Sequence, residues 1–312
     1  MTRREWMQRS ALACTAGSLG CRQQTPNKIG EPMDGEINPS REDYITARKG
    51  FRTKLTRVGP SPEPSEMPPP LGVPGALPFT YPSGGLQLLA WVNPEVKTAG
   101  PRRPAVMFLH GGFAFSPSHW EYARPFLRAG FHVLIPVLRG ENGQSGAYSL
   151  LYDEVDDCLA CAEHLSRAPS VDPAKIFLCG HGTGGTLALL SSLASDQFRA
   201  CAAFSPWPSI RTYLQGREQD APFDPRAEGE LRMRSPLYYA QHFRCPVRSF
   251  FGLGEGAEGE ANLATAKEMG RHARGSTKDV GELTVSGDSL SAIAPSTAAT
   301  IGFFRDLAGI RA

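Results

Sequence analysis

The sequence has no long hydrophobic run and almost no excess of charge. Its 312 residues contain no stretch of ~18 or more apolar residues, which excludes an ordinary transmembrane helix. Lys and Arg number 33 against 31 Asp and Glu, a net charge of +2, so no nucleic-acid partner is predicted. No internal repeat is visible. A hydrophobic content of 41% still leaves enough material for a large core.

Cysteine and histidine form no metal or disulfide pattern. Of the 7 cysteines, Cys158 and Cys161 make a CxxC pair within a helical stretch, with no second pair or histidine partner near in sequence. Two small residues on a buried helix face are the simpler interpretation, and zinc or redox chemistry is the alternative. The histidines lack zinc spacing, and no phosphate loop or dinucleotide fingerprint is present. We therefore predict no metal and no cofactor.

The N-terminus has the features of an export signal. Arg3-Arg4 precedes a mild apolar stretch, residues 11–19, and then Gly20-Cys21. This arrangement resembles a bacterial twin-arginine signal ending in a lipobox, over residues 1–21. It predicts an exported protein of a bacterium, periplasmic or held at the membrane by a lipid on Cys21. A cytosolic tail with a chance arginine pair is the alternative.

Two further segments follow. Residues 22–83 are polar and then proline-rich, which predicts a tether. From residue 84 to residue 312 short apolar runs alternate with helical stretches, which predicts one α/β domain: a mostly parallel sheet with helices on both faces. The predicted strands are 86–92, 105–109, 131–138, 176–179, 200–204, 247–251 and 283–285. The predicted helices are 120–128, 150–167, 184–195, 261–272 and 291–307. The excursion 205–234 suits a small lid or a surface insertion.

Two glycine motifs follow predicted strands. Gly180-His181-Gly182-Thr183-Gly184-Gly185 lies between a buried strand and a helix, which is the context of a nucleophile elbow, Gly-x-Ser-x-Gly. Gly182 stands at the serine position. His110-Gly111-Gly112 follows an earlier strand, as an oxyanion-hole loop does. A third glycine turn, residues 138–143, follows the next strand.

Together these motifs resemble the α/β-hydrolase superfamily, most closely its prolyl oligopeptidase-like and dienelactone hydrolase-like branch. Residues 152–157, 171–173 and 235–237 also resemble that branch. The resemblance covers about 86–307 and implies an α/β-hydrolase fold with esterase or peptidase chemistry. It further implies oxyanion donors at the backbone of Gly111, Gly112 and Thr183.

The resemblance implies a triad in the order serine, acid, histidine. The acid is expected shortly after the strand 247–251, where Glu255 stands; Glu258 and Glu260 lie close enough to be confused with it. The histidine is expected after the last strand, where Ser289 stands, and no histidine follows His272.

Two of the three chemical roles are therefore unfilled, because glycine has no nucleophilic atom and Ser289 is not a base. Thr183 and Ser205 are the alternative hydroxyls near the elbow, and His110 and His181 the alternative bases. For each, a packing or turn role is the simpler interpretation.

Three hypotheses remain. The first is a catalytically inactive hydrolase-fold protein, or pseudoenzyme, that keeps a pocket for a small ester-like or peptide-like ligand. The second is a working serine-type hydrolase with a displaced nucleophile or base. The third is a structural or interaction module whose pocket is filled by bulky side chains. We expect contact with a membrane only through a lipid on Cys21. The sequence does not indicate a protein partner.

Overall fold

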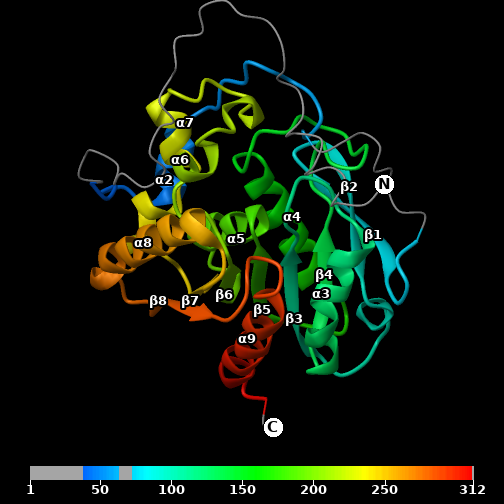
Figure 1. Cartoon of the computed structure of the whole chain (residues 1–312). Helices are drawn as coiled ribbons and strands as arrows, with labels where there is room; N and C mark the ends of the chain where they lie inside the picture. The colour runs from blue at the N-terminus through cyan, green and yellow to red at the C-terminus, as the bar shows by residue number, and fades with distance from the viewer. Residues whose placement is uncertain (1–37, 63–71, 311–312) are drawn as a thin grey trace, which may run out of the picture. The chain divides into compact units, whose positions relative to one another are not determined.

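The computed structural model describes residues 38–62 and 72–310, with an eight-stranded sheet at the centre of the fold (Figure 1). The strand order is β1-β2-β4-β3-β5-β6-β7-β8. β1–β2 and β2–β4 are antiparallel and the remaining neighbours are parallel. The strands are β1 Leu77–Ser83, β2 Leu86–Val92, β3 Arg103–Leu109, β4 His132–Pro136, β5 Val171–His181, β6 Phe198–Phe204, β7 Val247–Gly252 and β8 Val280–Val285.

Helices cover both faces of the sheet, as predicted (Figure 1). Val106 and Phe108 of β3 join a core with α3 and α9, whereas Met107 and Leu109 join a second core with α4 and α5. Strand residues alternate between the two cores because successive side chains point to opposite faces. The α-helices are α2 Tyr44–Gly50, α3 Pro117–Arg128, α4 Glu154–Ser166, α5 Thr183–Ala194, α6 Ile210–Leu214, α7 Glu228–Met233, α8 Gly256–His272 and α9 Ile293–Ala308.

The domain begins earlier than residue 84, where the sequence pattern placed its start. β1 pairs with β2 along its whole length, from Leu77 opposite Val92 to Ser83 opposite Leu86. The two prolines of β1 made this strand hard to recognise in the sequence, but proline is tolerated in an edge strand. The predicted export signal, residues 1–21, and Cys21 lie outside the described residues.

Residues 38–62, which we call the N-terminal strap, also pack on the domain and do not form a free tether. The Tyr44 ring is fully buried and its hydroxyl donates to the Met233 carbonyl at 2.9 Å. Leu55 forms a β-bridge with Phe223. At the far end, the Ser61 hydroxyl donates to the Phe113 carbonyl at 2.6 Å. The strap therefore crosses the 205–234 excursion and reaches the loop after β3.

A buried guanidinium joins the strap to the excursion. Arg234 is fully buried and donates to Glu230 at 2.6 Å and to the Leu150 carbonyl at 2.7 Å. Its other nitrogen donates to the Thr53 hydroxyl at 2.9 Å. A buried charge persists only when it is paired and hydrogen-bonded, so these contacts fix three distant segments against one another.

The helix predicted at 150–167 begins four residues later, at Glu154. Leu150 and Leu151 have positive φ, 54° and 69°, which a right-handed helix does not allow. Ser149 replaces the first turn: its hydroxyl accepts from Asp153 N at 2.7 Å, and its own N–H donates to the Glu154 carboxylate at 2.7 Å. The apolar spacing alone gave no sign of this turn.

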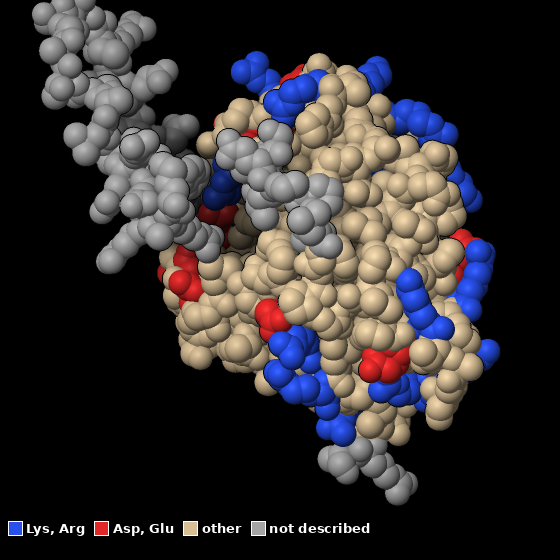
Figure 2. All heavy atoms as spheres, turned by 90° about the vertical axis from the view of Figure 1, so that its right-hand side faces the viewer, with Lys and Arg blue, Asp and Glu red and all other residues tan. Residues whose placement is uncertain are grey.

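On the face shown in Figure 2, lysine and arginine lie in separate groups around the rim, and only some of these groups have aspartate or glutamate beside them. Within the described ranges, no helix is long and apolar enough to cross a membrane.

Glu154 should make stability depend on pH. Complete burial raises the pKa of this carboxyl to about 7, from about 4.5 when unfolded. Between these values the folded protein keeps the proton and the unfolded chain loses it, so the unfolding free energy falls as pH rises, by at most ~1.4 kcal/mol per pH unit. We expect Glu154→Gln to remove this slope in urea unfolding.

The control is Glu163→Gln, on the exposed face of the same helix. The stability difference between wild type and Glu154→Gln should decline from acid to neutral pH and then level off. A difference independent of pH would contradict the assignment.

Candidate active site

The loops that carry the predicted site residues all follow the carboxyl ends of parallel strands. Gly111 follows β3, Gly182 follows β5, Ser205 follows β6, Glu255 follows β7 and Ser289 follows β8. Carboxyl ends of parallel strands meet at one edge of the sheet, which is where ligands bind in open α/β folds. The topology therefore brings these positions to one edge.

Gly182 forms the turn between β5 and α5, with φ 57° and ψ −122°. Its N–H donates to the Phe204 carbonyl at 2.8 Å. A Cβ added here would meet only ordinary contacts, the nearest being Trp207 Cζ3 at 3.7 Å. Space therefore does not require glycine at this position, although the positive φ favours it.

The neighbouring glycines are required by space. A Cβ at Gly180 would clash with the carbonyl of Gly184, and one at Gly184 would clash with the carbonyls of Leu109 and His110. β3, β5 and the start of α5 thus approach one another through bare backbone.

The loop after β3 packs against the turn. Gly111 lies so close to His181 that an added Cβ would be 2.7 Å from Nδ1. The Thr183 hydroxyl donates to the Gly112 carbonyl at 2.8 Å. His110 is buried, with Nε2 at 3.0 Å from Glu141 Oε2. Thr183 thus bonds to the loop after β3, and His110 of that loop bonds to Glu141 in the loop after β4.

His181 contacts the position where the histidine was expected. Its Nε2 lies 3.0 Å from the Ser289 carbonyl and 3.1 Å from the Ser289 hydroxyl. Burial lowers the pKa of His181, so the ring is neutral at pH 7. A carbonyl only accepts hydrogen bonds, so Nε2 carries the proton of the neutral ring. That nitrogen is therefore unable to take a proton from Ser289.

Glu255 has a different partner from the one that a triad provides. Its Oε1 accepts from the Ser205 hydroxyl at 2.5 Å and from Gly252 N at 2.5 Å. Ser205 has φ 45°, an uncommon conformation for serine. The structure thus joins two residues that the sequence pattern named separately.

Glu258 and Glu260, the carboxylates close to Glu255 in the sequence, have environments that differ from that of Glu255. Glu258 pairs with Arg217 at 2.9 Å, and Glu260 is exposed.

Trp207 is the site residue that sequence reasoning missed. Its ring faces the Cβ position of Gly182, and its Nε1 donates to Glu258 Oε1 at 2.9 Å. Its backbone N–H donates to the Thr186 hydroxyl at 2.8 Å, and the Tyr213 ring packs against it at 5.0 Å. The start of the predicted lid therefore lies directly at the elbow. The only available signal was Pro206-Trp207-Pro208 immediately after a strand.

The CxxC pair packs inside the core. Cys158 and Cys161 are fully buried in the core, and burial raises the pKa of both thiols. Within residues 38–62 and 72–310, no cluster of His, Cys, Asp and Glu is placed to hold a metal ion.

The comparisons identify the family. Residues 106–300 match the model of the alpha/beta hydrolase family, and the chain therefore belongs to that family. The rice (Oryza sativa subsp. japonica) acylamino-acid-releasing enzyme 2 is 31% identical over 113 residues, covering 33% of this chain and 15% of the enzyme.

Solved structures of similar fold include peptidases. An acylaminoacyl peptidase of Pyrococcus horikoshii has a TM-score of 0.58 and 20% identity, over 75% of this chain and 42% of that one. A puromycin-hydrolyzing peptidase of Mycobacterium tuberculosis has a TM-score of 0.61 and 21% identity, over 76% and 40%. The chain thus spans less than half the length of these relatives, and the likeness shows the fold. They represent the prolyl oligopeptidase-like branch that the motifs resemble.

Substitution of the elbow glycines should distinguish the stability cost of a steric clash from the cost of a strained backbone conformation. Gly182→Ala meets no clash and should cost ~1–3 kcal/mol of unfolding free energy for its positive φ. Gly184→Ala clashes with backbone carbonyls that have no room to move and should cost more, or prevent folding.

Gly302→Ala, in the exposed face of α9 with open space around it, is the control and should stabilise by ~0.5–1 kcal/mol. Urea unfolding would contradict this account if Gly184→Ala were as stable as Gly182→Ala.

Proposed function

We propose that this protein is a catalytically inactive member of its family that binds a small ester-like or peptide-like ligand at the elbow. The observation that carries the proposal is the elbow turn itself. Gly182 has a backbone conformation outside the usual regions for residues with side chains, yet bears no atom that attacks an acyl carbon.

The surrounding contacts support the same conclusion. Nε2 of His181 is committed as a donor to the Ser289 carbonyl, and Oε1 of Glu255 accepts from Ser205 and Gly252. A nucleophile, a base and an acid hydrogen-bonded in series are needed to activate a serine. The contacts of Gly182, Glu255 and Ser289 do not form such a series.

Binding is supported by what remains. Gly111 lies against the turn and the Thr183 hydroxyl donates to the Gly112 carbonyl, so we expect backbone N–H groups of Gly111, Gly112 and Thr183 to bind a ligand's carbonyl oxygen. Trp207 places its aromatic ring beside Gly182, and its indole nitrogen donates to Glu258. An ester or amide with an apolar substituent matches this combination of donors and aromatic surface.

Restoring the missing groups tests the proposal. Wild-type protein should hydrolyse p-nitrophenyl butyrate only slowly, since oxyanion donors and binding alone give about 10³-fold over water at most. Gly182→Ser with Ser289→His should raise that rate by about 100-fold or more, because a nucleophile and a base are returned beside Glu255. Rates are followed by p-nitrophenolate absorbance.

Two further variants distinguish the other hypotheses. If wild type is fast and Ser205→Ala or Thr183→Ala abolishes the rate, the protein is a hydrolase with a displaced nucleophile. If the restored variant stays inactive until Trp207→Ala is added, the indole fills the site and a structural module is favoured.

A further inference from the structure

Two loops cover the elbow turn. Gly182 is buried, and a Cβ there would lie within 4 Å of Trp207 in the 205–234 excursion and of Gly111 in the loop after β3. We call this excursion and this loop the two walls of the elbow. A ligand meets little open surface at the turn while both walls are in place, so the contacts that hold the walls govern access to it.

The second half of the strap bonds to the first wall. We call residues 55–61 the clamp. The backbone N–H groups of Thr56 and Arg57 donate to the Pro222 carbonyl at 2.7 and 3.1 Å. The Arg57 guanidinium donates to the Gln219 carbonyl at 2.9 Å. These bonds fasten the middle of the excursion to the strap.

The end of the clamp bonds to the second wall. Ser61 is buried, and its hydroxyl donates to the carbonyl of Phe113, in the loop after β3, at 2.6 Å. The Ser61 N–H donates to the Gly140 carbonyl at 3.0 Å, and the Tyr148 N–H donates to the Gly59 carbonyl at 2.9 Å. One short segment of chain therefore bonds to both walls.

Aromatic rings carry these contacts to the elbow. The Phe113 ring meets the Tyr213 ring edge-on at 6.1 Å, and Tyr213 packs against Trp207 at 5.0 Å. The Tyr213 hydroxyl donates to the Asp220 carboxylate at 2.7 Å, and the Asp220 carbonyl accepts from Arg57 at 3.4 Å. The clamp thus holds the segments from which the rings beside the turn project.

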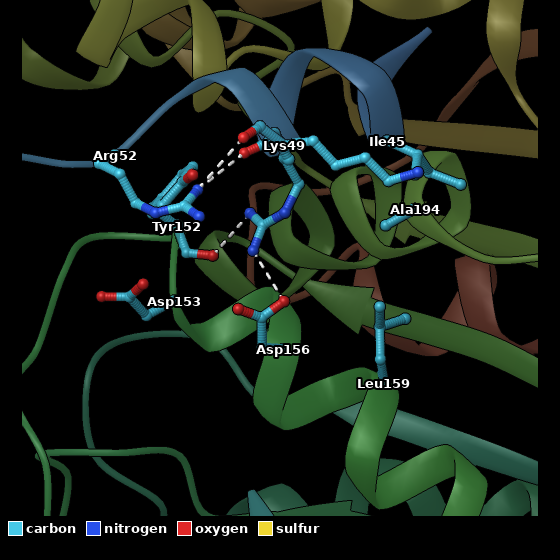
Figure 3. Close-up of a pocket in the computed structure, with 9 residues that line it drawn as sticks. Ile45, Lys49, Arg52, Tyr152, Asp153, Asp156, Leu159 and Ala194 are labelled. Atoms are coloured by element: carbon cyan, nitrogen blue, oxygen red, sulfur yellow. Dashed lines mark hydrogen bonds and ion pairs between the residues drawn. The ribbon is translucent and has the colours of Figure 1, made fainter. Parts of the chain in front are cut away.

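The first half of the strap has a separate attachment. Arg48 donates to Asp156 at 2.7 Å and to the Tyr152 carbonyl at 2.9 Å, and its guanidinium lies 4.4 Å from the centre of the Tyr152 ring (Figure 3). These contacts join α2 to the start of α4 and involve no residue of either wall. Release of the clamp therefore does not require release of α2.

The clamp itself is weakly packed. Val58, in its middle, leaves 75% of its surface exposed, and Thr56, Arg57 and Pro60 are also exposed. Segments with few buried apolar contacts and exposed backbone bonds open locally at a lower free-energy cost than global unfolding. The clamp is therefore the part of the strap that opens most easily.

We propose that residues 55–61 form a releasable clamp that keeps both walls of the elbow closed, and that ligand access to Gly182 requires its release. The role in ligand access rests on the proposed function. The effect of the clamp on the walls does not, because it follows from contacts that need no ligand.

Hydrogen exchange of the full-length protein, followed by mass spectrometry, tests the clamp. Arg57→Ala with Ser61→Ala removes its side-chain bonds to both walls. Amides of residues 111–116 and 205–223 should exchange faster than in wild type by about fivefold or more, because exchange follows local opening. Amides of β5 and α4 should keep their wild-type rates. If the double variant does not fold, Arg57→Ala alone should show the same change in residues 205–223.

A thiol at the elbow measures access directly. Gly182→Cys is treated with N-ethylmaleimide, and the modified peptide that contains position 182 is quantified by mass spectrometry. Adding Arg57→Ala and Ser61→Ala should raise this labelling rate by about fivefold or more. Since the reagent replaces the ligand, the result distinguishes the two proposals: a protein that opens in this way but binds no ester would contradict only the proposed function.

The matched control is Arg52→Ala. Arg52 is an exposed arginine of the same strap, but it donates to strap carbonyls, those of Arg48, Lys49 and Phe51 (Figure 3). Its loss should leave both exchange at the walls and labelling at position 182 unchanged. Unchanged labelling in the clamp variants, an equal rise with Arg52→Ala, or faster exchange throughout the sheet would overturn the proposal.

Discussion

Bare backbone contact between β3, β5 and the start of α5 is the constraint on which the rest of the site depends. The carbonyls of Leu109 and His110 lie where a side chain of Gly184 would be, and Gly180 faces Gly184 in the same way. This contact sets the position of the turn at Gly182. It also brings the His110-Gly111-Gly112 loop against His181.

The architecture of the elbow is thus maintained by residues other than the one that usually performs the chemistry. Gly182 has room for a side chain, whereas Gly180 and Gly184 do not. Glycine at position 182 is therefore compatible with the fold, and the uncommon φ there costs less for glycine than for serine.

The polar groups around the turn are satisfied by one another. Ser289 gives His181 a carbonyl acceptor, and Ser205 gives Glu255 a hydroxyl donor. Buried polar groups without partners are costly, so these contacts stabilise this edge of the sheet. Trp207 and Glu258 form a hydrogen bond at the part of the sheet edge that adjoins the 205–234 excursion.

The parts of the fold with regular apolar patterns were predictable from sequence. β2 lies at the predicted residues, and α5 and α9 begin and end within two residues of theirs. The position of Gly182 in the elbow could be predicted from the flanking glycines, because local steric contacts require glycine at those positions.

The other parts depend on contacts between distant residues. The strap is held by hydrogen bonds from Tyr44 and Ser61 and by the Leu55 bridge, none of which has a periodic pattern. Trp207 contacts Glu258, which is 51 positions away. Such pairs have no local signal, so sequence reasoning named Ser205 and Glu255 without joining them.

We propose that the elbow has kept its backbone and lost its acyl-transfer chemistry. Intact-mass spectrometry of the wild-type protein after incubation with a fluorophosphonate probe tests it most directly, because the probe labels activated hydroxyls. The account predicts no adduct on the folded protein. A stoichiometric adduct mapped to Ser205, Thr183 or Ser289 would contradict it.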